Sequence, residues 1–563
     1  MKKRAANMII EQLVLHGVDY VFGVTGKAIS PLIDALIDFD SIQFIATKHE
    51  TGAALMAYGY AQGTGKIGVC CGTTGGGSTN LATGVATAFM NSIPLLVVTG
   101  QVSTFEFGKG AFQESTGQGQ SINTVDFFKS ISKASIFIDS VDNIREKIDH
   151  AIQLATTGRM GPVHINIPFN LQLAELPIPD VETSIATNHN KDNACFDSDV
   201  IEAVQLLVES INPVFLIGWG AVLSGAHRDI ISIAERYDIP VATTIQGKGG
   251  IPSNHYLCLG IFGVCGHSMA SDYIFEHADL VIAVGTTFGE FSTFNWDDRV
   301  VSNKKMIQID IDHREIGKNY PVTLGINGDA SVIARLLKVE LERINPSPKN
   351  SGRQVEEMID RIGRVINPHL MDSLQVPLKP QRVMKEIRDN TPDNTLFLAD
   401  SGAHWAWAMH YLHVHHGGGF YPTLGLGSMG ASICSSVGIK LAKPDHPVVC
   451  ICGDGSFLMY GNEITTAGHY NVPVIWIILN DARYNLPSHS IKKMFDRTIG
   501  VDFREINFSK LAEVYGLKGY RIEKPGDLSI ALQESLYLNS PVVIDVVIDP
   551  DEMPPLGRRK LTV

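Results

Sequence analysis

Short, continuous apolar runs recur along the whole chain, each followed by a longer stretch of mixed apolar and polar residues. Runs rich in Val, Ile and Leu without polar alternation are typical of strands buried on both faces, as in parallel sheets covered by helices. The predicted strands cover residues 20–24, 67–72, 95–100, 213–218, 239–245, 280–285, 306–311, 448–452, 472–479 and 542–548. This alternation predicts an α/β fold that is repeated more than once along the chain.

Two stretches rich in proline and polar residues interrupt the alternation. Residues 177–198 and 345–378 lack strand signals, although 355–365 fits a short helix. Cutting at both stretches predicts three doubly wound parallel-sheet domains of ordinary domain size. The predicted domains cover residues 1–180, 190–345 and 375–563. Whether the first and third domains share a topology stays open at this point.

The first predicted helix covers residues 8–18, where apolar positions are mixed with Glu11, Gln12 and His16. This pattern indicates an amphipathic helix rather than the apolar core of a signal peptide. No apolar run reaches the roughly 18 residues that a transmembrane helix needs, so we expect no membrane span.

The composition narrows the class of protein further. The 563 residues carry 46 basic and 59 acidic side chains, a net charge of −13, which disfavours a nucleic-acid partner. A local anionic ligand stays compatible with this charge, because backbone N–H groups or a metal can hold a phosphate. None of the 8 cysteines forms a C-x-x-C pair. We interpret them as reduced, small apolar residues of a cytoplasmic protein rather than as disulfides or zinc ligands.

The most informative motif is Gly453-Asp454-Gly455-Ser456, which directly follows an apolar strand and precedes a helical pattern over 459–470. Glycine permits a close approach of backbone to ligand, Asp is a hard ligand for Mg²⁺, and a helix N-terminus suits phosphate. Taken alone, the motif is also explained by an ordinary turn with an Asp N-cap. However, a second strand ends at Asp481, 27 residues after Asp454, so two oxygen ligands are expected at one sheet edge.

Gly-Asp-Gly followed about 27 residues later by Asn480-Asp481 resembles the cofactor signature of thiamine-diphosphate (ThDP) enzymes. The resemblance covers nearly the whole chain and is strongest to the acetolactate synthase branch, within a group that includes pyruvate decarboxylases and benzaldehyde lyase. It implies a pyrimidine-binding, a central and a diphosphate-binding domain, in that order. The chain departs from the family at Asp481, where a second Asn is usual. The resemblance implies that Asp454, the Asp481 side chain and the Arg483 carbonyl hold Mg²⁺.

Glu50 begins a segment crowded with small residues, 50–61. Read alone, it is an acid at a helix N-terminus, stabilised by the helix dipole. In the family that the chain resembles, this segment carries the glutamate that activates ThDP. The resemblance therefore implies that Glu50 hydrogen-bonds the cofactor pyrimidine and promotes its imino tautomer, which a low-dielectric site strengthens.

Further residues receive roles from the same resemblance, each with a plainer alternative. Met429 would wedge between the cofactor rings and the Gly427 carbonyl would accept a hydrogen bond, or the segment is a glycine-rich loop with a core methionine. His404 would line the reacting carbon, or it is a structural donor. Lys27 would attract a substrate carboxylate, or it points into solvent. The remaining implied cofactor and substrate positions are Gly26, Gly75, Asn80, Gln113, Ser401, Gly402, Gly453, Gly455 and Ser456.

The implied reaction is decarboxylation of a small 2-oxo acid, with pyruvate as the expected donor, and ligation of the two-carbon unit to an acceptor carbonyl. Ala111-Phe112-Gln113-Glu114 matches acetolactate synthases, whereas residues 482–489 lack their usual acceptor-site pattern. A non-ligating decarboxylase, a benzaldehyde-lyase-like enzyme and a catalytically inactive regulatory relative stay open as alternatives. A dehydrogenase is disfavoured, since no G-x-G-x-x-G follows the first strand.

Two further expectations concern the central domain and the assembly. Residues 285–291 stand where flavin-containing relatives carry two arginines, and neither arginine is present, which leaves FAD a doubtful ligand. Family geometry places ThDP between the first domain of one subunit and the third domain of another. The resemblance therefore implies a homodimer at least, with a homotetramer expected.

Overall fold

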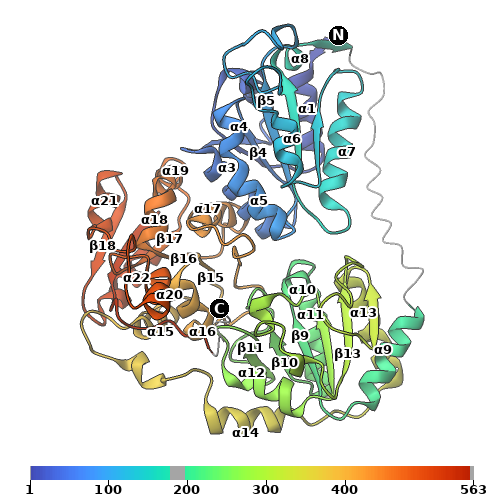
Figure 1. Ribbon diagram of the computed structural model, residues 1–563, viewed down its shortest axis with the longest axis vertical. Helices are drawn as coiled ribbons and strands as arrows, with labels where there is room; N and C mark the ends of the chain where they lie inside the picture. Colours follow the sequence, from blue (N-terminus) through green and yellow to red (C-terminus); the bar gives the residue numbers. More distant parts are fainter. Residues whose placement is uncertain (1, 178–196, 558–563) are drawn as a thin grey trace.

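The computed structural model describes residues 2–177 and 197–557, which form three sheet-centred units (Figure 1). Most of the predicted linker 177–198 lies outside the described residues. The chain is α/β, as predicted: three parallel sheets are each covered by helices on both faces. A short antiparallel pair, β1 (Lys2–Arg4) with β8 (Glu175–Pro177), closes the first unit.

The first sheet has the strand order β3-β2-β4-β5-β7-β6, all parallel. Alternate residues of its central strands enter two separate cores: Cys70 and Val97 face one, whereas Cys71 and Val98 face the other. The strands are β2 (Tyr20–Gly23), β3 (Gln43–Ala46), β4 (Gly68–Gly72), β5 (Leu95–Gln101), β6 (Ala134–Phe137) and β7 (Val163–Pro168). The helices are α1 (Ala5–Leu15), α2 (Ser30–Ala35), α3 (Glu50–Thr64), α4 (Gly76–Asn80), α5 (Ala82–Met90), α6 (Thr124–Lys129), α7 (Ile144–Thr156) and α8 (Phe169–Gln172).

The central sheet has the order β11-β10-β9-β12-β13-β14 and is also parallel. Here too, alternate residues of β9 face two cores. The strands are β9 (Pro213–Ile217), β10 (Val241–Thr243), β11 (Cys258–Ile261), β12 (Leu280–Val284), β13 (Lys305–Asp310) and β14 (Leu324–Asn327). The helices are α9 (Asp197–Glu209), α10 (Trp219–Leu223), α11 (His227–Tyr237), α12 (Ser268–Asp272), α13 (Ala330–Ile344) and α14 (Gly352–Ile362).

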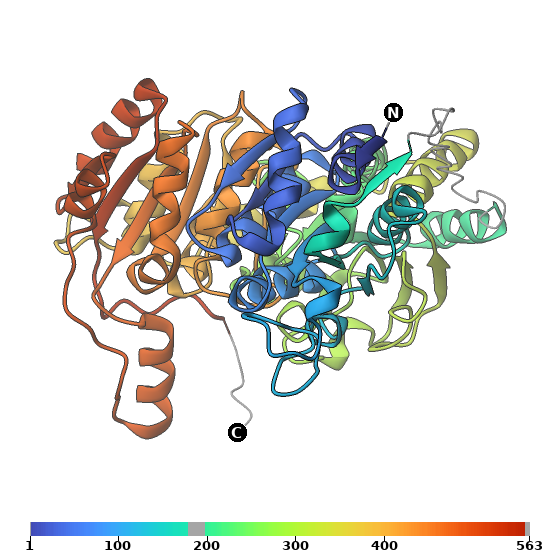
Figure 2. The ribbon, with the colours of Figure 1, turned by 90° about the horizontal axis from the view of Figure 1, so that it is seen from above.

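The third sheet has the parallel order β15-β16-β17-β19-β18. Its strands are β15 (Leu396–Ala399), β16 (Val448–Gly453), β17 (Ile475–Asn480), β18 (Lys518–Ile522) and β19 (Val542–Val547). The helices are α15 (Pro380–Asp389), α16 (Ala403–Tyr411), α17 (Ala431–Ala442), α18 (Asp454–Tyr460), α19 (Ile464–His469), α20 (Asn485–Phe495), α21 (Phe508–Val514) and α22 (Asp527–Leu538). Figure 2 shows α20 standing away from the body, in orange.

The first and third sheets share one topology, which answers the question that the sequence left open. Their strands follow each other in the same spatial order, except that the first sheet has an additional edge strand, β3, beside β2. At the equivalent edge of the third sheet, Phe420 forms a single parallel bridge with Phe397 of β15. The first and third units therefore present the carboxyl ends of equivalent strands.

Three predicted helices need adjusted limits. The helix predicted over 8–18 is α1, which begins at Ala5 and ends before Gly17, a residue with a positive φ of 71°. The helix predicted over 355–365 is α14, which ends at Ile362, before the C-cap residue Gly363. The pattern over 459–470 begins earlier, because α18 starts at Asp454 directly after the strand, and a short 3-10 turn separates it from α19. The metal-ligand motif thus lies inside the first turn of a helix.

Helices α3 and α17 join the first unit to the third through one continuous apolar core. Nearly every residue of α3 is buried, and its small side chains permit a close approach of the two helix backbones. A Cβ placed on Gly59 would lie 2.0 Å from the Ser435 carbonyl oxygen, and one on Gly438 would lie 2.0 Å from that of Met56. These glycines set the distance between the two helices.

We expect Gly59→Ala to lower the free energy of unfolding by about 1–3 kcal/mol, because an added methyl group must push the helices apart. Gly289→Ala is the matched control, since a Cβ there meets nothing within 4 Å and its φ is not positive. Chemical denaturation of both variants beside the parent chain measures the difference. Equal stability of the two variants would contradict this account of the helix contact.

Two sequence expectations can be compared with the described residues. No helix within 2–177 and 197–557 is long and apolar enough to cross a membrane. The seven cysteines in these ranges are free and buried, as expected for small apolar residues. The eighth, Cys195, lies outside the described residues.

Candidate active site

The two predicted metal ligands of the third unit lie together at the carboxyl ends of neighbouring strands. Asp454 follows β16, Asp481 follows β17, and these strands pair in register. One Asp454 oxygen accepts from the backbone N–H groups of Asp481 (3.0 Å) and Ala482 (2.7 Å), and the other accepts from that of Gly455 (2.7 Å). Ala482 has a φ of 57°, which turns the chain around the carboxylate.

Ionisation of both Asp454 and Asp481 is unfavourable unless a cation compensates their charges. Burial raises the pKa of Asp454 to about 6. Burial, and then the charge of Asp454, raises the pKa of Asp481 to about 8. Oxygen ligands that lose solvation in this way suit a hard cation such as Mg²⁺. The described residues contain no group of three His, Cys, Asp or Glu that could hold a metal. A cation here would therefore also need backbone and cofactor oxygens.

A buried imidazole lies beside these carboxylates. His404, in the first turn of α16, fits between two glycines: a Cβ on Gly402 would lie 2.5 Å from its ring, and one on Gly453 would lie 2.7 Å from its Nδ1. Burial lowers its pKa to about 3, so the ring is neutral. Its Nε2 is buried and has no hydrogen-bond partner among the described residues. An unsatisfied polar atom of this kind fits a bound polar group such as a diphosphate oxygen.

The Gly427–Met429 loop packs over the same strand ends. A Cβ on Gly455 would lie 3.5 Å from the Met429 Cε, which places the methionine above the metal-ligand turn. Ser456 donates to the Ser401 carbonyl (3.3 Å) and so links the loops that follow β15 and β16. The predicted residues brought together at these strand ends are Ser401, Gly402, His404, Met429, Gly453, Asp454, Gly455, Ser456 and Asp481.

Asp400 is a site-forming residue that the sequence analysis missed. It is fully buried after β15 and accepts from the backbone N–H groups of Gly430 (2.6 Å) and Ser432 (2.8 Å). Burial raises its pKa to about 6. The carboxylate therefore fastens the loop that carries Met429 to the end of the strand. The sequence does contain one signal for this residue: Asp400 directly follows an apolar strand, as Asp454 does.

The second group of predicted residues lies at the carboxyl edge of the first sheet. Glu50 is the first residue of α3, is 8% exposed, and accepts from Asn80 Nδ2 (2.9 Å). A Cβ on Gly77 would lie 3.1 Å from the other Glu50 oxygen, so the absence of a side chain leaves that oxygen room. A second missed residue, Glu463, accepts from the backbone N–H groups of Lys48 and His49 and so fixes the turn before Glu50.

The predicted substrate-side residues join this group. Gly26 lies against Thr73, whose hydroxyl accepts from the Ala28 backbone N–H (3.3 Å), and this places the neighbouring Lys27 at the sheet edge. A Cβ on Gly75 would lie 3.1 Å from Gln113, which has a φ of 64°. Lys27 and Gln113 are both exposed.

The chain thus presents two half-sites rather than one closed site. Within residues 2–177 and 197–557, no hydrogen bond joins Glu50, Lys27 or Gln113 to the group around Asp454. The two half-sites occupy the first and third units, on equivalent edges of sheets with the same topology.

A cavity of about 990 Å³ lies between the three units and reaches Ser401, Gly402 and Gly427 of the half-site in the third unit. Its charged lining comprises Arg159, Glu290, Asp310 and Asp329. Arg159 contacts Glu315 (3.3 Å), and burial raises the pKa of Asp310 to about 6. The cavity is large enough for a dinucleotide, but its charges do not favour a diphosphate.

Comparison with known families agrees with this arrangement. Residues 3–121 match the N-terminal TPP binding domain of thiamine pyrophosphate enzymes, residues 200–337 their central domain and residues 400–546 their C-terminal TPP binding domain. The chain therefore has the three domains of a thiamine pyrophosphate enzyme.

Similar curated proteins narrow the class. A probable acetolactate synthase large subunit from Methanococcus aeolicus is 36% identical, over 97% of this chain and 92% of its own length. The acetolactate synthase large subunit of Lactococcus lactis subsp. lactis is 32% identical, over 97% and 93%. The acetolactate synthase isozyme 3 large subunit of Escherichia coli K12 is 31% identical, over 97% and 95%. The chain belongs to the acetolactate synthase-like branch of the ThDP-dependent enzymes.

Proposed function

We propose that the protein decarboxylates a small 2-oxo acid, with pyruvate as donor, and ligates the two-carbon unit to an acceptor carbonyl. The observation that carries this proposal is that both half-sites are intact in a chain similar to acetolactate synthases over nearly its whole length. An inactive relative would be expected to have lost a carboxylate, whereas Glu50, Asp454 and Asp481 are all present.

The residues of the third unit fit ThDP and Mg²⁺. Asp454, Asp481 and the Arg483 carbonyl would hold the cation, and Ser401, Gly402 and His404 would face the diphosphate. Ser456, in the first turn of α18, would add its backbone N–H, whereas that of Gly455 already donates to Asp454. When bound, ThDP supplies an electron sink for the bond that the decarboxylation breaks.

The residues of the first unit would hold the pyrimidine half of the cofactor. The buried Glu50 carboxylate would hold a proton at the pyrimidine ring. Asn80 donates to one Glu50 oxygen and leaves the other free to face the ligand. Gln113 and Lys27, exposed at the same edge, would orient the substrate carboxylate.

We further propose that the working unit is at least a homodimer, with a homotetramer expected, in which Glu50 of one subunit completes the Asp454 half-site of another. The separation of the half-sites within one chain supports this arrangement. We also place the enzyme in the cytoplasm, which the seven free cysteines of the described ranges support. FAD is not assigned to the 990 Å³ cavity, because Arg159, the one cation among the described lining residues, already contacts Glu315.

Product analysis tests the proposed reaction. Purified protein with ThDP, Mg²⁺ and pyruvate is expected to release CO₂ and form 2-acetolactate, observed by NMR. Glu50→Gln is the matched inactive control. Acetaldehyde as the only product would identify a non-ligating decarboxylase. Failure to consume pyruvate, with turnover of an acyloin instead, would identify a benzaldehyde-lyase-like enzyme.

A further inference from the structure

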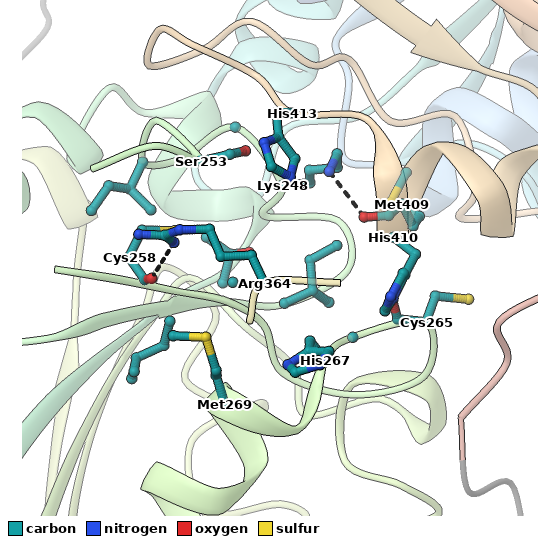
Figure 3. A pocket seen from close by; sticks show the side chains of 17 residues that line it. Lys248, Ser253, Cys258, Cys265, His267, Met269, Arg364, Met409, His410 and His413 are labelled. Carbon is teal, nitrogen blue, oxygen red and sulfur yellow. Dashed lines mark hydrogen bonds between the residues drawn. The ribbon is translucent and has the colours of Figure 1, made fainter. Parts of the chain in front are cut away.

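A second, small pocket lies where the central unit meets the third unit, apart from both half-sites (Figure 3). It encloses about 60 Å³. The central unit contributes Lys248 and His267, the connection between the units contributes Arg364, and the end of α16 with the residues after it contributes His410 and His413. The described residues that line the pocket include no Asp or Glu.

Lys248 is a buried cation without a counter-ion among the described residues. Its side chain is 6% exposed, and its ammonium group donates to the Met409 carbonyl (3.0 Å) and lies 5.9 Å from the centre of the Phe420 ring. Burial lowers the pKa of Lys248 to about 8. An ammonium group has three donors, and a buried charge is costly unless it is paired. The described residues that line the pocket therefore supply no negative charge to pair with the Lys248 ammonium group.

Arg364 adds a second cation to the same wall. Its Nη1 donates to the Cys258 carbonyl (2.9 Å) and its Nη2 donates to the His255 carbonyl (3.2 Å). A guanidinium has five N–H donors, so these two bonds leave others available. Within residues 2–177 and 197–557, neither Lys248 nor Arg364 forms an ion pair with a carboxylate.

The histidines add neutral polar groups around the two cations. The Nδ1 of His267 is buried and has no partner among the described residues. Both ring nitrogens of His410 already have hydrogen-bond partners. One contacts the Cys265 carbonyl (3.0 Å), and the other accepts from the Ile366 backbone N–H (3.0 Å). Burial lowers the pKa of His413 to about 4. The unpartnered His267 Nδ1 therefore lies in the same pocket wall as the positively charged side chains of Lys248 and Arg364.

We propose that this pocket binds a small oxyanion of the phosphate or carboxylate class, held by Lys248 and Arg364. The volume of 60 Å³ exceeds the roughly 10–15 Å³ that one water needs, so a tetrahedral oxyanion fits. Water alone would satisfy the donors but would leave both charges uncompensated. The inference concerns a site separate from the cofactor half-sites and does not depend on the proposed reaction.

Occupation of this site would reach the active site through one helix. Lys248 holds the carbonyl of Met409 in the last turn of α16, and His404 lies in the first turn of the same helix. An anion bridging Lys248 and Arg364 would fasten the central unit to this end of α16. The site is therefore placed to stabilise the relative position of the two units.

Calorimetric titration of the holoenzyme tests the proposal, with saturating ThDP and Mg²⁺ so that the diphosphate site is filled. Inorganic phosphate, sulfate and acetate are added separately, with chloride at equal ionic strength as reference, and the melting temperature is followed in parallel. We expect saturable binding and a raised melting temperature with at least one oxyanion. Stronger binding of phosphate and sulfate than of acetate would identify a tetrahedral ligand, and the reverse order a carboxylate.

Two variants decide where the anion binds. Lys248→Met and Arg364→Gln are each expected to weaken binding by about tenfold or more, because each removes a charge-assisted hydrogen bond. Lys440→Met is the matched control: Lys440 is also buried and donates to two carbonyls (Pro444 and His446), but it lies outside the pocket. Loss of binding in the control as well, or unchanged binding in both pocket variants, would overturn the proposal. So would the absence of saturable binding of every oxyanion to the parent enzyme.

Discussion

Glu50→Gln is expected to lower turnover by roughly 10²–10⁴-fold while leaving the fold in place, the range that a positioned acid–base group contributes. Gln has the same shape and still offers an oxygen to Asn80 Nδ2. It cannot hold an exchangeable proton at the cofactor, because its amide does not titrate. The Glu50→Gln variant therefore removes the proposed chemical role of Glu50 while it keeps the packing around the side chain.

The stability of this variant should change little. Removing the charge forfeits a favourable interaction with the N-terminus of α3, which is worth roughly 0.3–1 kcal/mol. Asp527→Asn is the control, because Asp527 is likewise the first residue of a helix but is exposed and outside both half-sites. Steady-state kinetics and thermal melts of the two variants give the comparison. Turnover of Glu50→Gln close to that of the parent would remove Glu50 from the catalytic role.

The sequence predicted longer strands that are apolar on both faces, such as β5 and β16, because burial on both sides leaves an unbroken apolar run. It missed β15, which is apolar and fully buried but only four residues long. It missed β7, which is equally buried, since His164 and Asn166 interrupt the run. In the structure, the two His164 ring nitrogens pair with the hydroxyls of Thr99 and Ser135, both at 2.7 Å. Such lateral pairing depends on strands that only the fold brings together.

Edge strands were missed for a different reason. Strand β6 has only partly buried residues, and β18 is exposed at its first residue, so neither produces an apolar run. Their position in the sheet, rather than their own side chains, makes them strands. Local sequence cannot show this, because the partner strand supplies the stabilising hydrogen bonds.

The residues of the candidate site likewise fall into two groups: those that a local sequence pattern predicts and those that it does not. Asp454 and Asp481 were predictable because each directly follows a strand, and parallel strands end at one edge. Glu463 was not, since its partners at Lys48 and His49 lie 415 and 414 residues away. Residues that act by holding a distant backbone segment have no local signature. The buried Lys248 and the half-buried Arg364 likewise have no local signature that marks them as lining one pocket.

Asp454→Asn should abolish cofactor retention, whereas Asp481→Asn should preserve it. The Asp454 carboxylate accepts hydrogen bonds from three backbone N–H groups. In the Asn variant, the amide NH₂ is itself a donor and would face at least one of these backbone donors without an acceptor between them. Loss of a ligand is expected to weaken Mg²⁺-dependent ThDP binding by about 100-fold or more, since even outer-shell changes cost 10–100-fold. Asp481→Asn keeps an oxygen for Asn485 Nδ2 and removes one of two adjacent buried charges. Titration calorimetry, with and without a chelator, measures both variants.

The same variant also tests where the complete site is formed. Chains with Glu50→Gln and chains with Asp454→Asn should each be inactive alone. In a mixed dimer, the unaltered Glu50 of one subunit would meet the unaltered Asp454 of the other, so one of the two sites would be intact. Co-expression of the two chains with different affinity tags, followed by tandem purification, should therefore restore up to about half of the parent activity. A site closed within one chain would leave the mixed dimer inactive, because every chain carries one defect.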